Sequence, residues 1–224
     1  MIISNTLLLI DTAQQRATVA LANGAEVIIS AENLVSKDHA SWLHEAIDGM
    51  LDKTGLTHGD LKGVAVVAGP GSYTGLRVGM AAAKGYCYTL QIPLMTFNTL
   101  RVMAESVRLQ AEERDALVCP MLDARRSEVF TALYDARMKE ILEPQALILD
   151  KSSFEKELNS KTIVYFGDGA GKWEKICPSN HAQFIQQPPV LHYLAQLAGE
   201  SFVSGRFADP VYAEPVYLKE FFTY

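Results

Sequence analysis

Cysteine is scarce in this sequence. Its 224 residues include three cysteines, Cys87, Cys119 and Cys177, which are widely spaced and odd in number. That pattern argues against a disulfide framework and against the paired cysteines of a zinc knuckle. We therefore expect free thiols and a cytoplasmic protein.

Long apolar runs and a basic excess are lacking as well. The apolar run Leu7–Ile10 ends at Asp11 and no basic region precedes it, so we expect a buried strand there, not a signal peptide or membrane span. A formal net charge of −6 argues against unaided, tight binding to a phosphate backbone. Any nucleic-acid role would therefore need a partner.

Acidic residues are missing from one long stretch. Between Leu61 and Ala104 there is no Asp or Glu, whereas four basic residues fall there: Lys62, Arg77, Lys84 and Arg101. A helix packed deep in the core would leave no room for carboxylates. The alternative is a surface that faces an anion or an acidic partner.

The most informative feature that is present is a glycine-rich segment, Gly69–Gly79. An apolar strand pattern, Val64–Ala68, leads into it, and an alanine-rich helical pattern, Thr74–Leu90, leaves it. Strand, glycine turn and helix N-terminus together form a cradle of backbone N–H groups. We expect a tight turn at Gly69, Pro70 and Gly71, followed by a helix cap from Ser72 or Thr74.

Known nucleotide loops do not match this cradle. A P-loop needs Gly-Lys-Ser/Thr, but Leu76 and Arg77 follow Gly75, and a dinucleotide loop needs an acid about 20 residues later, which the acid-free stretch does not supply. Instead Gly75, Gly79 and Ala83, at four-residue spacing, form a flat stripe with Ala82 and Tyr86 beside it. The stripe permits either packing inside the lobe or a protein interface, and we favour the interface slightly.

The two halves of the chain repeat one design. The hairpin pattern Leu7–Leu21 with Asp11 recurs at Leu117–Tyr134 with Asp123, and a second strand enters a glycine turn at Gly167 as the first does at Gly69. This repetition predicts a duplicated α/β unit with mixed sheets. We place the lobes at residues 1–113 and 114–224, the second with a helix at 188–204 and an aromatic tail.

Candidate chemical groups are few. Asp11 and Asp123 end the first strand of each half and are either metal- or phosphate-binding residues or turn residues. Gly167 and Gly169 are weak nucleotide-site candidates. His39 and His44 lie five residues apart and cannot share a metal from adjacent turns, and His58, His181 and His192 have no acidic or cysteine partner at ligand spacing. We predict no metal site and no catalytic residue.

The glycine-rich segment also carries a resemblance. Gly69-Pro-Gly-Ser-Tyr-Thr-Gly-Leu-Arg-Val-Gly79 is similar to the most characteristic motif of the bacterial TsaB family of tRNA threonylcarbamoyladenosine biosynthesis proteins, with Tyr73 where phenylalanine is commoner. Four further segments agree in the same order: Leu9–Thr12, His39–Ser41, Asp123–Val129 and Pro215–Lys219.

The resemblance implies an ASKHA fold (actin, sugar kinase and Hsp70 architecture) with two RNase H-like lobes. It also implies a non-catalytic scaffold subunit that works with a TsaD-type paralogue and a TsaE-type ATPase in threonylcarbamoyl transfer to tRNA. This chain would form a homodimer when TsaD is absent and meet tRNA only indirectly. ATP and magnesium or another metal would bind to the partner subunits, and none to this chain. The alternative is a stand-alone ASKHA ATP-dependent phosphotransferase or ATPase.

On this basis the helices after Ser41 and Thr74 are expected to dock the partner. The interface hypothesis comprises Trp42, Leu43, Ala46, Met50, Gly75, Gly79, Ala82, Ala83 and Tyr86. It predicts that Gly79→Arg or Ala83→Trp blocks association without unfolding the chain.

Overall fold

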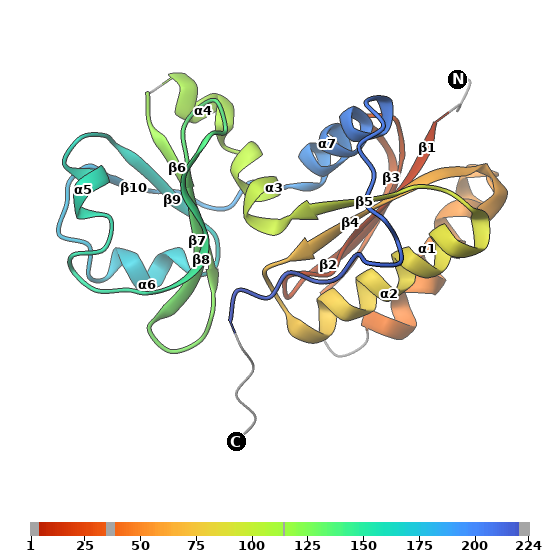
Figure 1. The fold of residues 1–224 in the computed structure, drawn as a ribbon, viewed down its shortest axis with the longest axis horizontal. Helices are drawn as coiled ribbons and strands as arrows, with labels where there is room; N and C mark the ends of the chain where they lie inside the picture. The colour runs from red at the N-terminus through yellow and green to blue at the C-terminus, as the bar shows by residue number, and fades with distance from the viewer. Residues whose placement is uncertain (1–4, 35–38, 114, 220–224) are drawn as a thin grey trace. The chain divides into compact units, whose positions relative to one another are not determined.

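The computed structural model describes residues 5–34, 39–113 and 115–219 of the chain. The chain forms two compact units (Figure 1). The first runs up to Thr99 and includes Leu191–Val216, and the second comprises Leu100–Val190 and the chain from Tyr217. Among the described residues, every helix is too short or too polar to cross a membrane.

The first unit contains a mixed five-stranded sheet. Buried apolar residues fill its central strands, and the order is β3-β2-β1-β4-β5. Strands β1 to β3 are antiparallel neighbours, whereas β4 and β5 run parallel to β1. The strands are β1 (Thr6–Asp11), β2 (Ala17–Asn23), β3 (Glu26–Asn33), β4 (Leu61–Gly69) and β5 (Leu94–Asn98).

Helices cover both faces of this sheet (Figure 1). Helices α1 (His39–Thr54) and α2 (Tyr73–Leu90) contact each other and pack on one face, with the short helix η1 (His58–Asp60) after α1. Helix α7 (Leu191–Val203) contacts β1 to β5 from the other face. The apolar stripes of α1 and α2 follow the helical period, so both helices bury one side.

The second unit repeats the same sheet. Its order is β10-β9-β6-β7-β8, with β6 to β8 antiparallel and β9 and β10 parallel to β6. Its core lies on both faces of the sheet, under α3 and α4 on one side and α5 and α6 on the other. The elements are β6 (Leu117–Asp123), β7 (Glu128–Tyr134), β8 (Glu140–Ile148), β9 (Ile163–Phe166), β10 (Ala182–Phe184), α3 (Thr99–Glu105), α4 (Arg108–Glu113), α5 (Glu155–Leu158) and α6 (Ala170–Glu174).

The predicted duplication of an RNase H-like α/β unit is therefore confirmed. The compact units nevertheless do not follow the division at residues 113 and 114. Helix α7 packs on the first sheet because the buried side of the helix, at Leu194, Ala195 and Ala198, closes the face that α1 and α2 leave open. Helices α3 and α4 belong to the second unit.

Two details of the second unit and the C-terminal segment remain. Helices α3 and α4 are separate because the chain leaves the helix after Glu105, where the Ser106 hydroxyl donates to the Met103 carbonyl oxygen at 2.6 Å and competes with the helical ladder. In the aromatic tail, Phe207, Tyr212 and Tyr217 are exposed, and Phe221, Phe222 and Tyr224 lie outside the described residues.

Candidate functional site

The glycine-rich segment forms a tight turn between β4 and α2, as predicted. Gly69 has φ +120°, which favours glycine, and a Cβ atom on Gly71 would lie 2.1 Å from the Ala13 carbonyl oxygen. Between them the Gly69–Pro70 peptide is cis. Ser72, not the exposed Thr74, caps the helix, since its hydroxyl accepts a hydrogen bond from the Gly75 amide at 3.3 Å.

The cradle is occupied by the chain itself. The Ser72 amide donates to the Ala13 carbonyl oxygen at 2.6 Å, and the Thr12 hydroxyl donates to the Gly75 carbonyl oxygen at 2.7 Å. A Cβ atom on Gly75 would lie 2.0 Å from the Thr12 carbonyl oxygen, and one on Gly79 would lie 2.3 Å from the Thr12 hydroxyl. The glycines of the motif thus make room for the turn after β1.

The predicted interface residues fall into two groups. Trp42, Ala46 and Tyr86 are half-buried at the outer side of α1 and α2. The other six pack inside the first unit: Leu43, Met50, Gly75, Gly79, Ala82 and Ala83. For Gly75 and Gly79 the contacts are those of internal packing. The expectation that Gly79→Arg would leave the fold intact is wrong, because its side chain would collide with Thr12.

Asp11 lies beside the occupied cradle and is buried. Its carboxylate accepts a hydrogen bond from the Ala13 amide at 3.0 Å, which is the turn chemistry considered from the sequence. Burial raises the pKa of Asp11 to about 6, and the hydrogen bond from Ala13 lowers it by less. The buried carboxyl group of Asp11, next to the motif, therefore has a pKa at which it is half-ionised at about pH 6.

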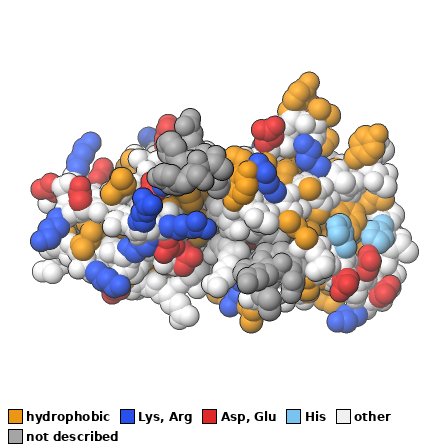
Figure 2. Space-filling model, turned by 90° about the horizontal axis from the view of Figure 1, so that it is seen from below, with side chains coloured by type: hydrophobic (Ala, Val, Ile, Leu, Met, Phe, Trp, Pro, Cys, Tyr) orange, Lys and Arg blue, Asp and Glu red, His pale blue; other side chains and the backbone are white. Residues whose placement is uncertain are grey.

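An aromatic and histidine cluster joins α1, η1 and α2 at their outer side. The Tyr86 hydroxyl lies 3.3 Å from Nδ1 of His44, and the His58 ring stacks on Tyr86 with 5.7 Å between centroids. Nε2 of His58 lies 3.2 Å from Oδ1 of Asp48. Figure 2 shows histidine and acidic side chains together on this face. Burial, and then the Asp48 charge, raise the pKa of Tyr86.

Sequence reasoning missed this cluster. His58 has an acidic partner after all, because η1 brings it back to α1, ten residues earlier in the sequence, where Asp48 lies. The available signal was the four-residue spacing of His44 and Asp48, which places both on one side of α1.

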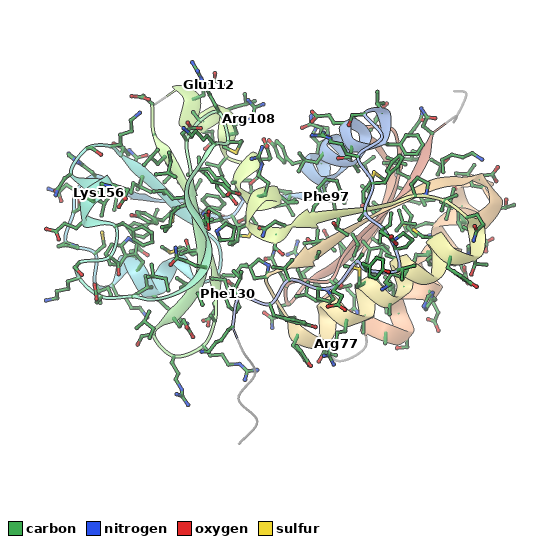
Figure 3. The ribbon with its side chains drawn as sticks, in the orientation of Figure 1. Arg77, Phe97, Arg108, Glu112, Phe130 and Lys156 are labelled. Carbon is green, nitrogen blue, oxygen red and sulfur yellow. The ribbon has the colours of Figure 1, made fainter. Side chains whose placement is uncertain are left out.

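The basic residues of the acid-free stretch do not form one cationic surface. The Lys84 ammonium donates to the carbonyl oxygens of Val211 and Ala213 at 3.2 and 3.0 Å. Arg101 pairs with Glu105 at 2.8 Å. Arg77, which projects from the N-terminal part of α2 (Figure 3), lies over the Tyr73 ring, 4.0 Å from its centroid.

The second aspartate, Asp123, ends β6 in a more polar setting. Its carboxylate accepts from the Lys172 ammonium at 2.6 Å and from the Arg125 amide at 2.6 Å, and its own amide donates to Asp168 at 2.8 Å. Partial burial raises the pKa of Asp123, but the Lys172 and Arg125 bonds lower it by more, so the net pKa is below the ordinary value. Burial raises the pKa of Asp168.

The glycine turn beside Asp123 is also used for close packing. Gly167 has φ +100°, and a Cβ atom there would lie 2.2 Å from the Met121 carbonyl oxygen. A Cβ atom on Gly169 would lie 2.8 Å from the Leu122 carbonyl carbon. A shallow cavity of about 510 Å³ lies next to this turn, lined by Asp123, Asp168, Gly171, Lys172, Glu174 and Lys175. Among the described residues, no group of three or more His, Cys, Asp or Glu side chains could hold a metal ion.

Comparisons with a protein-family model and with known proteins point to the same family. Residues 25–158 match the family model described as TsaD, tRNA N6-adenosine threonylcarbamoyltransferase. The tRNA threonylcarbamoyladenosine biosynthesis protein TsaB of Bacillus subtilis is 31% identical over 147 residues, which cover 64% of this chain and 62% of that protein. TsaB of Escherichia coli is 28% identical over 221 residues, which cover 95% of this chain and 94% of that protein.

Solved structures agree on the fold. A Pseudomonas aeruginosa protein described as uncharacterised, with similarity to peptidase YeaZ, superposes with a TM-score of 0.81 at 24% identity, over 96% of this chain and all of the other. A second structure, YeaZ from Pseudomonas aeruginosa, gives a TM-score of 0.76 at 23% identity, again over 96% of this chain and all of the other. Together with the repeated sheets, these matches identify the ASKHA-type α/β fold.

Proposed function

The chain belongs to the TsaB branch of the TsaD family, and on that premise we propose that it is a non-catalytic scaffold subunit for threonylcarbamoyl transfer to tRNA. Its involvement in tRNA threonylcarbamoyladenosine biosynthesis follows from its relatives. The proposal adds that it docks a TsaD-type paralogue, works with a TsaE-type ATPase in the cytoplasm, and pairs with a second copy of itself when TsaD is absent.

The observation that carries this proposal is the occupied cradle. In a phosphate-binding loop the backbone N–H groups at the helix N-terminus point at the ligand. Here the Ser72 amide is bonded to Ala13, the Gly75 amide to the Ser72 hydroxyl, and the Leu76 amide to the Ser72 carbonyl oxygen. These three donors are engaged within the chain, which supports a structural use of the motif over phosphate transfer.

The outer side of α1 and α2 is the docking face that we propose. Trp42, Ala46 and Tyr86 lie there at the edge of the core. The close contacts of Gly75 and Gly79 with Thr12 hold α2 against the turn that follows β1. Two neighbouring helices in fixed positions suit docking against the two equivalent helices of a homologous lobe. The side-chain ridges of one helix pair can then fit into the grooves of the other. The six buried residues of the interface hypothesis would affect docking indirectly, because their packing sets the positions of α1 and α2.

Gly85 provides a sharper test of the docking face than Gly79. It is exposed on α2 beside Tyr86, and a Cβ atom there would meet nothing within 4 Å. We expect Gly85→Arg to block co-purification with the TsaD-type partner and to abolish tRNA modification while the far-UV circular dichroism stays unchanged. Asn159→Arg, at an exposed position directly after α5 (Glu155–Leu158) in the second unit, is the matched control.

Reconstitution tests the scaffold role directly. Purified TsaD-type and TsaE-type proteins, with ATP and unmodified tRNA, should form threonylcarbamoyladenosine only when this chain is added. Modification at the same rate without the chain would contradict the proposal. Heat of ATP binding to this chain alone in calorimetry, lost on Asp11→Ala, would favour the phosphotransferase alternative instead.

A further inference from the structure

The loop between β6 and β7 has a backbone conformation that its residues do not favour. Arg125 and Arg126 have φ values of +69° and +48°. At positive φ the Cβ atom of an L-residue crowds the backbone, so glycine, asparagine and aspartate are usual there. Two consecutive arginines at positive φ are an outlier, and such outliers cluster at functional sites.

The loop is held firmly at its base. The Arg125 amide donates to the Asp123 carboxylate at 2.6 Å, and the Ala124 amide donates to the Glu128 carbonyl oxygen at 3.1 Å. The Lys172 ammonium connects the two ends of the loop, since it donates to the Asp123 carboxylate at 2.6 Å and to the Glu128 carbonyl oxygen at 3.0 Å. The two arginines therefore stand exposed on a fixed support.

Two carboxylates at the base of the loop have cationic partners within the chain. Asp123 pairs with Lys172, and Glu128 pairs with Lys219. Within the described part of the chain, neither Arg125 nor Arg126 forms an ion pair in the structure. Both guanidinium groups are thus available to an external anion.

We propose that Arg125 and Arg126 bind the phosphate backbone of tRNA when the chain is part of its complex. The planar donor fork of arginine matches two phosphate oxygens, and a fixed pair can meet successive phosphates. Because the whole chain carries a formal charge of −6, this contact is local and the RNA must be held elsewhere as well. The inference rests on the proposed function, and the named pathway of the relatives supplies the polyanion.

The test uses the complex of this chain with its TsaD-type partner. Binding of unmodified tRNA is measured by fluorescence anisotropy at several salt concentrations. For Arg125→Ala/Arg126→Ala we expect binding about tenfold weaker at roughly 0.1 M salt, and a log–log salt slope smaller by about 1.4 to 1.8. Lys151→Ala/Lys156→Ala removes the same charge from two exposed positions, one just before α5 and one within it, and should leave the slope unchanged.

A second variant separates binding from folding. Arg125→Asn/Arg126→Gly supplies residues that suit positive φ, so the loop keeps its shape while both guanidinium groups are removed. It should weaken tRNA binding as much as the alanine pair does. Retained affinity in this variant would overturn the proposal.

Three other results would also overturn it. The alanine pair could bind tRNA as tightly as the unsubstituted chain, or the Lys151/Lys156 control could weaken binding equally through overall charge. The alanine pair could instead lose only the TsaD-type partner, which would mean that the arginines recognise an acidic protein surface. Failure of the proposed function is distinct, because the unsubstituted chain would then form no complex or support no modification.

Discussion

At the residue scale, Asp11 is a carboxylate whose burial opposes its own ionisation. Its pKa in the folded protein is about 6, against an ordinary value of 3.8, so the folded state binds the proton more tightly than the unfolded state. The stability contributed by protonated Asp11 is complete below the unfolded pKa and is lost as pH rises through about 6.

We expect Asp11→Asn to raise the free energy of unfolding at pH 7 by about 3 kcal/mol, since it removes a buried charge but can accept the same hydrogen bond. Below about pH 4 the two proteins should differ little. Urea unfolding at a series of pH values measures this. A difference that does not change between pH 4 and pH 7 would contradict the assigned pKa.

The arginine loop makes a second prediction at this scale. Because each arginine at positive φ is unfavourable, Arg125→Asn/Arg126→Gly should raise the free energy of unfolding by about 1 to 2 kcal/mol. Thermal and urea unfolding measure the change, and Lys151→Ala/Lys156→Ala should stay within about 0.5 kcal/mol. A gain in stability together with a loss of tRNA binding would show that the loop is kept for its side chains.

At the scale of elements, the central contact is between the turn after β1 and helix α2. Gly71 in the turn before α2 approaches Ala13, and Gly75 and Gly79 on successive turns of α2 approach Thr12. Glycine inside a helix is normally unfavourable by about 1 kcal/mol relative to alanine, so its use here reflects the close approach. The motif therefore joins two segments that are about 60 residues apart in sequence.

Two glycines of the same helix should respond oppositely to alanine. Gly75→Ala is expected to lower the free energy of unfolding by about 3 kcal/mol or more, because the methyl group would lie 2.0 Å from the Thr12 carbonyl oxygen. Gly85→Ala should raise it by about 0.5 to 1 kcal/mol, since the site is open and alanine favours helix. Urea unfolding of both variants checks this, and equal changes would contradict the role assigned to Gly75.

At the scale of the whole molecule, each unit depends on its own set of helices. The first sheet is covered by α1 and α2 on one face and by α7 on the other, although α7 follows Leu100–Val190 of the second unit in the sequence. Deletion of α7 would uncover the apolar face of that sheet to water. The first unit should therefore be the more sensitive to truncation.

We expect a chain that ends at Val190 to lose the first unit selectively. In hydrogen exchange, amides of β1, β2 and β4 should exchange rapidly, because the buried side of α7 at Leu194, Ala195 and Ala198 is gone. Amides of β6, β7 and β9 should stay protected and serve as the internal control. Protection of β1 and β4 equal to that in the full chain would contradict this assignment.

Much of the fold was predictable from local sequence. The strand patterns, the glycine turn after β4, the Ser72 cap and the duplication each depend on residues that are close together or on a repeated order. The placement of α7 was not predictable, because its apolar stripe would fit either sheet. The cluster of His44, His58 and Tyr86 joins three elements and has no local signature.

The sequence by itself determined the family, the two repeated α/β units and the lack of known phosphate-loop residues. Periodicity, turn residues and motif order are local properties, so they can be read along the chain. Only the tertiary structure decided what the glycine motif holds, since a small-residue stripe permits a close contact without specifying the neighbour. That neighbour is the chain's own Thr12–Ala13 turn, which seats against Gly71, Gly75 and Gly79 because no side chain stands in the way.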